Sequence, residues 1–125
     1  MKNRFLLALS VIMFSALAAC SVASAPINPD EEITLIIRFE ASEEGVSEFE
    51  EIMAGVAGAM ASEPGFQAAT VHRNIDQPNV FVLEEVWASR ALHEEHFDTI
   101  NRSGDWSHIR SLLVREPEMG YYQSR

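Results

Sequence analysis

Two histidines, His93 and His96, are the side chains of this sequence best suited to chemistry. They fall in a segment over 90–101 whose apolar residues recur at helical spacing. At about 100° per residue both imidazoles lie in the apolar stripe, with His96 bracketed by Leu92 and Ile100. A half-buried imidazole can take up a proton at neutral pH, so His96 is predicted to be a base or substrate anchor and His93 its alternate. The alternative for His96 is a core histidine hydrogen-bonded to a strand.

A strand predicted over 80–87 carries Glu85 and Trp87 on the same face, because side chains alternate along a strand. Trp87 is predicted to be a pocket wall. Glu85 would be partly buried and would need a partner. It either orients His96 or forms an ion pair with an arginine such as Arg73, and the ion pair is the simpler alternative.

His72, on a strand predicted over 66–74, is a weaker pocket candidate. The alternative for His72 is an exposed or interface histidine. His93 and His96 could share a metal, but a catalytic zinc site needs a third ligand and an ordered second shell. No third ligand occurs at motif spacing, so we predict no metal site.

Composition restricts the classes of protein that this chain can represent. It has 125 residues, 14.0 kDa, 47% hydrophobic residues and a formal net charge of −10. These values fit one folded domain, and the negative charge disfavours nucleic acid and anionic membrane surfaces as partners. A single cysteine excludes an internal disulfide framework, and no glycine-rich loop for nucleotide phosphates is present.

The first 19 residues are predicted to be a bacterial lipoprotein signal peptide. Lys2 and Arg4 precede an uncharged apolar run over 5–19, which is short for a membrane span. The run ends in Leu-Ala-Ala-Cys at 17–20, which resembles a lipobox. In that motif the cysteine, here Cys20, receives lipid and becomes the new N-terminus.

The alternative is ordinary secretion, with cleavage after Ala-Ser-Ala at 23–25, which the following Pro26 disfavours. Lipidation of Cys20 implies anchoring in the bacterial cell envelope, with the lipid as the only membrane contact. Ser21 after the cysteine predicts the outer membrane, facing the periplasm, if the cell is Gram-negative. Residues 20–31 are predicted to form an extended tether.

The remaining residues, 32–125, are predicted to form one α+β domain of β-α-β-β-α-β order. This order is typical of the ferredoxin-like fold, an antiparallel sheet with its helices on one face. The other face would be apolar and bare, so the fold predicts a homodimer formed through the sheets. The expected strands are 33–40, 66–74, 80–87 and 120–123, and the expected helices are 46–60, 90–101 and 106–114.

Several motifs then occur in a fixed order. Glu-Pro-Gly-Phe at 63–66 opens a strand, a second strand over 79–87 ends in Glu-x-Trp, and Ala-Leu follows at 91–92. His96 stands nine residues after Trp87. Together these motifs resemble the antibiotic biosynthesis monooxygenase (ABM) family, which includes quinol monooxygenases.

The resemblance implies a dimeric α+β barrel that oxidises phenolic or quinol substrates with O2 and uses no metal, flavin or other cofactor. His96 would help to form a phenolate-like anion that can give an electron to O2, and Trp87 would line the pocket. We therefore predict an envelope-anchored, cofactor-independent monooxygenase that acts on a small aromatic or quinol-like compound.

Two alternatives remain open. One is a non-catalytic lipoprotein of the same fold that binds a small molecule or haem. The other is a structural dimer that has lost its site. Haem-degrading relatives place an asparagine on the first strand, where this chain has Leu-Ile-Ile at 35–37. This difference disfavours haem degradation and leaves haem binding open.

Overall fold

The computed structural model describes residues 28–125. The predicted signal peptide, Cys20 and the tether up to residue 27 lie outside the described residues. No helix between residues 28 and 125 is long and apolar enough to cross a membrane.

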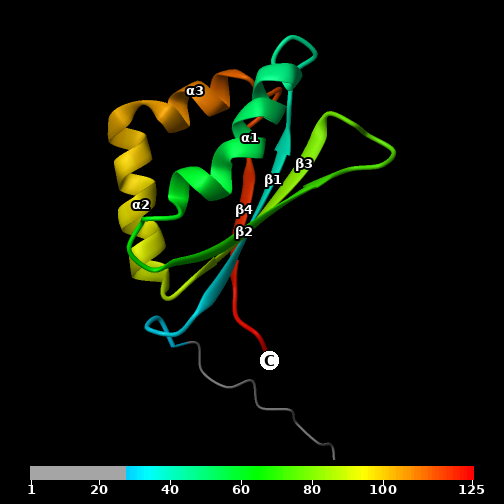
Figure 1. The fold of residues 1–125 in the computed structure, drawn as a ribbon. Helices are drawn as coiled ribbons and strands as arrows, with labels where there is room; N and C mark the ends of the chain where they lie inside the picture. The colour runs from blue at the N-terminus through cyan, green and yellow to red at the C-terminus, as the bar shows by residue number, and fades with distance from the viewer. Residues whose placement is uncertain (1–27) are drawn as a thin grey trace, which may run out of the picture.

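The described chain forms a four-stranded antiparallel sheet whose order is β2-β3-β1-β4. All the helices lie on one face of this sheet (Figure 1). The predicted α+β ferredoxin-like fold is therefore confirmed. The elements are β1 (Ile33–Glu40), α1 (Val46–Met60), β2 (Phe66–Arg73), β3 (Val80–Trp87), α2 (Arg90–Ser103), α3 (Asp105–Ser111) and β4 (Glu118–Tyr122).

Three boundaries differ from the prediction by two residues or more. Helix α2 continues to Ser103 and ends at Gly104, whose φ of +90° lies in the left-handed region. Helix α3 is shorter than the predicted 106–114 and ends at Ser111. Strand β4 begins at Glu118, two residues before the predicted start, because its ladder with β1 extends that far along the edge. A strand end is set by its partner as well as by its own residues.

The alternating pattern of β1 determines which residues form the core. Its odd-numbered residues are buried under the helices, and its even-numbered residues are half-buried on the opposite face. Strand β3 lies beside β1, with Leu35 opposite Glu85 and Ile37 opposite Leu83. The apolar stripe of α1 then covers this face through Phe49, Met53 and Met60. The buried, odd-numbered residues of β1 that α1 helps to cover are Ile33, Leu35, Ile37 and Phe39.

Gly65 joins the end of α1 to β2 at a point where a side chain has no room. Its φ is +82°, and an added Cβ would lie 2.4 Å from Cδ1 of Leu92 on α2. We expect Gly65→Ala to lower the free energy of unfolding by about 2–5 kcal/mol, from backbone strain plus overpacking, as measured by urea denaturation. Gly104→Ala is the matched control, because Gly104 also has positive φ but no atom within 4 Å, so its loss should be about 1–2 kcal/mol. Equal losses would contradict a role for the Leu92 contact.

Candidate active site

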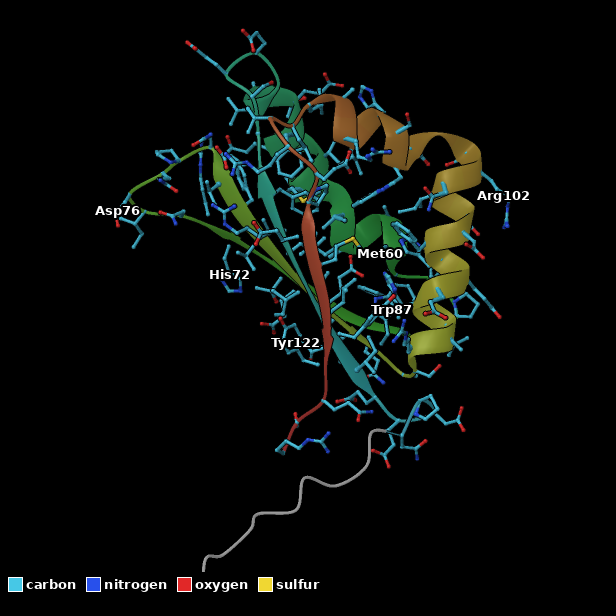
Figure 2. The ribbon with its side chains drawn as sticks, turned by 180° about the vertical axis from the view of Figure 1, so that it is seen from behind. Met60, His72, Asp76, Trp87, Arg102 and Tyr122 are labelled. Atoms are coloured by element: carbon cyan, nitrogen blue, oxygen red, sulfur yellow. The ribbon has the colours of Figure 1, made fainter. Side chains whose placement is uncertain are left out.

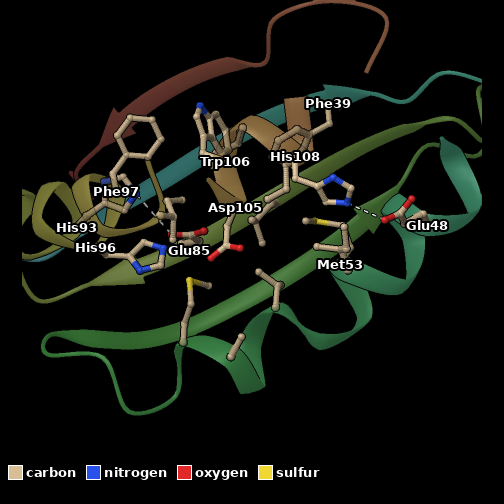
Figure 3. Close-up of a pocket in the computed structure, with 18 residues that line it drawn as sticks. Phe39, Glu48, Met53, Glu85, His93, His96, Phe97, Asp105, Trp106 and His108 are labelled. Atoms are coloured by element: carbon tan, nitrogen blue, oxygen red, sulfur yellow. Dashed lines mark hydrogen bonds and ion pairs between the residues drawn. The ribbon is translucent and has the colours of Figure 1, made fainter. Parts of the chain in front are cut away.

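A cavity of about 380 Å³ lies between the sheet and the three helices (Figure 3). Its walls are mostly apolar and come from β1, β3 and all the helices. Pockets of this size and character commonly hold small organic molecules. Six ionisable side chains line the cavity: Glu48, Glu85, His93, His96, Asp105 and His108.

Both histidines of α2 turn inward, as the helical periodicity predicts. His93 is 2% exposed and His96 is 9% exposed, and both line the cavity. The helix begins at Ser89, whose side-chain oxygen accepts a hydrogen bond from the Leu92 backbone N–H at 3.3 Å. This cap fixes where the helix starts, and therefore which residues face the sheet.

His96 lies between the α1–β2 turn and Trp87. Its Nδ1 is 3.2 Å from Oε1 of Glu63 without forming a hydrogen bond, so the two groups form an ion pair only when the imidazole is protonated. The centroid of the ring is 5.2 Å from that of Trp87. Within residues 28–125 neither ring nitrogen of His96 has a hydrogen-bond partner. The predicted alternative of a core histidine hydrogen-bonded to a strand is therefore wrong.

Glu85 is a buried carboxyl group at the floor of the same cavity. The Trp87 indole Nε1–H donates a hydrogen bond of 2.7 Å to Oε2 of Glu85. Burial raises the pKa of Glu85, against the opposing effects of this hydrogen bond and of nearby His96. The suggested ion pair with Arg73 is wrong, because Arg73 lies at the far end of β2 and pairs with Glu50 on α1 at 2.8 Å.

His93 is held on both sides. Its Nδ1 is 2.8 Å from the Tyr121 hydroxyl oxygen, and its Nε2 is 3.8 Å from Oε2 of Glu85. Burial, followed by the charge of His96, lowers the pKa of His93 from 6.5 to about 4. His93 is therefore neutral at physiological pH, which makes it a weaker candidate for the base than its place in the stripe suggests.

The low pKa of His93 predicts a loss of stability in acid. Between pH 6.5 and about 4 the unfolded chain binds a proton that the folded chain does not, so stability falls as the pH falls. The raised pKa of Glu85 has the opposite effect on stability in acid. This effect is common to the wild type and to a His93→Gln variant, because both contain Glu85. We expect the stability advantage of the wild type over His93→Gln to shrink by about 2–3 kcal/mol between pH 7.5 and 4.5, measured by urea denaturation. If the difference in the free energy of unfolding between the two proteins stayed constant across this pH range, it would contradict the lowered pKa of His93.

Two other predicted site residues lie elsewhere. Trp87 is 0% exposed and is not part of the cavity wall; it packs behind Glu85, His93 and His96, so its prediction as a pocket wall is wrong. The indole N–H of Trp87 donates a hydrogen bond to the Glu85 carboxyl group. His72 is exposed on the side of the sheet away from the helices, because it pairs with Val82 in the outward-facing register (Figure 2). This position agrees with the alternative of an exposed or interface histidine for this residue.

Other residues of the site are separated from the two histidines in the sequence. Tyr121 contacts His93 because β4 lies beside β1 at the sheet edge. At the other end of the cavity, Nε2 of His108 on α3 is 2.7 Å from Oε1 of Glu48 on α1. No local spacing could have joined these residues, which are 28 and 60 positions apart.

A ferredoxin-like sheet with an apolar, histidine-containing cavity beneath its helices defines an α+β domain that can hold a small organic molecule. Residues 32–104 match the family model described as antibiotic biosynthesis monooxygenase. The chain belongs to this family, and it is thereby an oxidoreductase of the monooxygenase type.

Solved structures agree with this assignment. The chain is similar to SnoaB, a cofactor-independent oxygenase from Streptomyces nogalater, with 26% identity, a TM-score of 0.66, and coverage of 76% of this chain and 94% of SnoaB. It shares its fold with Rv0793 from Mycobacterium tuberculosis, with 18% identity, a TM-score of 0.67, and coverage of 76% and 96%. A conserved protein from Methanosarcina mazei has 16% identity, a TM-score of 0.68, and coverage of 78% and 96%. No curated protein matches the chain.

Proposed function

We propose that this protein is a cofactor-independent monooxygenase that oxidises a small aromatic or quinol-like compound with O2. The observation that carries the proposal is an apolar cavity in which two buried imidazoles and one buried carboxyl group converge. The likeness to SnoaB supports the same class of reaction. The walls suit a flat apolar ring, and the polar groups suit its hydroxyls.

The reaction needs the substrate to become an anion. A base removes the proton of a phenolic hydroxyl, and the phenolate gives an electron to O2. A C–O bond then forms at the neighbouring ring carbon, and the peroxide formed takes the proton back from the base to give a hydroperoxide. Loss of the hydrogen on that carbon, with cleavage of the O–O bond, leaves a carbonyl group and releases one water molecule. The substrate supplies all the electrons, so no further reductant is required.

His96 is the better base of the two histidines. The pKa of His93 is about 4, and its Nδ1 is already bonded to Tyr121. His96 lines the cavity, and no residue in the described part of the chain bonds its Nε2. Nδ1 faces Glu63, whose carboxylate would stabilise the imidazolium formed when Nε2 accepts a proton.

We propose that the domain acts as a homodimer joined through the outer face of the sheet. This face carries half-buried Ile36, Val82 and Val86, and Tyr122 is 57% exposed beside them. Such an apolar face is costly to leave in water. We expect Val82→Lys to convert dimers to monomers in light scattering, whereas an unchanged mass would contradict this interface.

We further propose lipid anchoring in the cell envelope, which rests on the lipobox-like residues 17–20. An apolar substrate would concentrate near a membrane. Cys20→Ala should move the protein from the membrane fraction to the soluble fraction. Retention of the variant on membranes would contradict anchoring through Cys20.

The activity is tested with the full chain in mild detergent, using 1,4-dihydroxynaphthalene as the probe and a metal chelator in the buffer. We expect one O2 consumed per molecule, no H2O2, and one ¹⁸O atom in the hydroxynaphthoquinone formed under ¹⁸O2. Release of one H2O2 per molecule would indicate simple quinol oxidation instead. If folded protein gives no uptake above the spontaneous rate with a panel of dihydroquinones and polyphenols, the oxygenase proposal fails. A haem titration would then test the alternative that the protein binds haem without catalysing a reaction.

A further inference from the structure

The hydrogen bond between His93 and Tyr121 separates two hollows. His93 lines the inner cavity, whereas Tyr121 lines a smaller recess of about 170 Å³ on the outside of the domain, together with Arg90 and Gln123. The two side chains meet at 2.8 Å. A group on the cavity side is thus connected to the surface by a single hydrogen-bonded step.

The cavity side of this connection ends at Glu85. Oε2 of Glu85 is 3.8 Å from Nε2 of His93, about 0.8 Å beyond hydrogen-bond length, which a small rotation of the carboxyl group can close. Oε2 also accepts the Trp87 hydrogen bond, and no residue between 28 and 125 bonds Oε1. Figure 3 shows the carboxyl group directed toward the cavity. Glu85 can therefore meet a substrate and His93 at the same time.

The surface end of the connection is polar and partly open. The Arg90 guanidinium lies over the Tyr121 ring, 4.5 Å from its centroid, and Glu94 pairs with Arg90 at 2.7 Å. Burial raises the pKa of Tyr121, so its hydroxyl keeps its proton at neutral pH and can donate it to Nδ1 of His93. When Tyr121 donates in this way, Nε2 of His93 carries the imidazole hydrogen and faces Glu85.

We propose that Glu85 is a second catalytic residue, the acid that completes the reaction, and that His93 and Tyr121 form the path that returns its proton from solvent. The proposal rests on the monooxygenase function proposed above. Glu85 and His93 line the cavity, whereas Tyr121 acts through His93 and is a positioning and relay residue.

The proton balance is closed over one turnover. When the O–O bond of the hydroperoxide breaks, Glu85 gives its proton to the departing oxygen, which leaves as water, while His96 takes the proton from the ring carbon. His93 then passes its Nε2 proton to Glu85 and receives the Tyr121 proton at Nδ1, and water reprotonates Tyr121. Before the next turnover His93 releases its Nδ1 proton and regains one at Nε2 by exchange with water, which restores the starting tautomer. His93 stays neutral throughout, which agrees with a pKa of about 4. His96 returns its proton to solvent, so no net proton is consumed.

The kinetic test compares the full-length wild type with Tyr121→Phe and Glu85→Gln, using 1,4-dihydroxynaphthalene. We expect each variant to lower kcat by about 10- to 100-fold, with KM changed less than about twofold. Formate or imidazole in the buffer should restore part of the rate of Tyr121→Phe, because a small acid can replace a relay but cannot repair a packing defect. Glu95→Gln is the matched control for Glu85→Gln, because Glu95 is exposed on α2 and does not line the cavity, and it should retain the wild-type rate.

A second measurement does not depend on activity. The ¹⁵N NMR spectrum of the wild type should show His93 as neutral at pH 7, with its hydrogen on Nε2, and Tyr121→Phe should shift the Nδ1 signal. A hydrogen on Nδ1 in the wild type would overturn the proposed path. Unchanged kcat in both Tyr121→Phe and Glu85→Gln, in an active wild type, would also overturn it and leave the monooxygenase function intact. An inactive wild type with the expected NMR spectrum would overturn the monooxygenase function and, with it, the catalytic role of Glu85, leaving only the hydrogen-bond geometry.

Discussion

His96→Gln is expected to lower kcat for 1,4-dihydroxynaphthalene by about 10²- to 10⁴-fold, the usual contribution of a general base. Glutamine keeps the length and polarity of the side chain but cannot accept the phenolic proton. His96 lines the cavity, and no described residue bonds its Nε2, so this nitrogen is available to the substrate. The measurement is steady-state O2 uptake, with chelator present and the spontaneous rate subtracted.

The chain provides a matched control for this variant. His72→Gln makes the same chemical change away from the cavity, on the outer face of the sheet that includes the proposed dimer interface, and should leave both the mass in light scattering and kcat unchanged. His96→Ala with added imidazole should recover part of the rate, because the base is then supplied in solution. A rate for His96→Gln within a few-fold of the wild type, with His93→Gln inactive, would contradict the assignment and make His93 the base.

Trp87→Ala is expected to have the largest effect on stability, lowering the free energy of unfolding by about 3–5 kcal/mol. The indole is 0% exposed and packs edge-on against Phe66 and His93 and at a lower angle against His96. Its removal leaves a cavity and also deprives Glu85 of its hydrogen bond. Urea denaturation followed by circular dichroism measures the loss.

The hydrogen-bond part of this effect can be separated from the packing part. Trp87→Phe keeps most of the ring but removes the indole N–H, and we expect a loss of about 1–3 kcal/mol from leaving the Glu85 carboxyl unpaired. In a Glu85→Leu background the same substitution should cost less, because no buried carboxyl needs a donor. Equal costs in both backgrounds would show that the Trp87–Glu85 bond contributes nothing to stability.

Local pattern determined much of the fold. The alternation of 33–40 places every second residue in the core, and the helical spacing of α2 places His93 and His96 on its inner face. Gly104 ends α2 and Ser89 caps it, as their residue types suggest. These features depend on a period of about two or 3.6 residues, so a short segment contains all the information they need.

The contacts of the site depended on the tertiary structure. Periodicity placed Trp87 and Glu85 on one strand face, but it did not show that Trp87 lies behind the cavity wall and holds Glu85 by its N–H. Tyr121 meets His93 only because β4 pairs with β1 in one register. The repeat of a strand or helix determines the face on which a side chain lies. The residue that this side chain contacts depends on strand order, register and helix placement. Those are properties of the whole chain, and they decide which imidazole is held neutral and which is left to receive a proton.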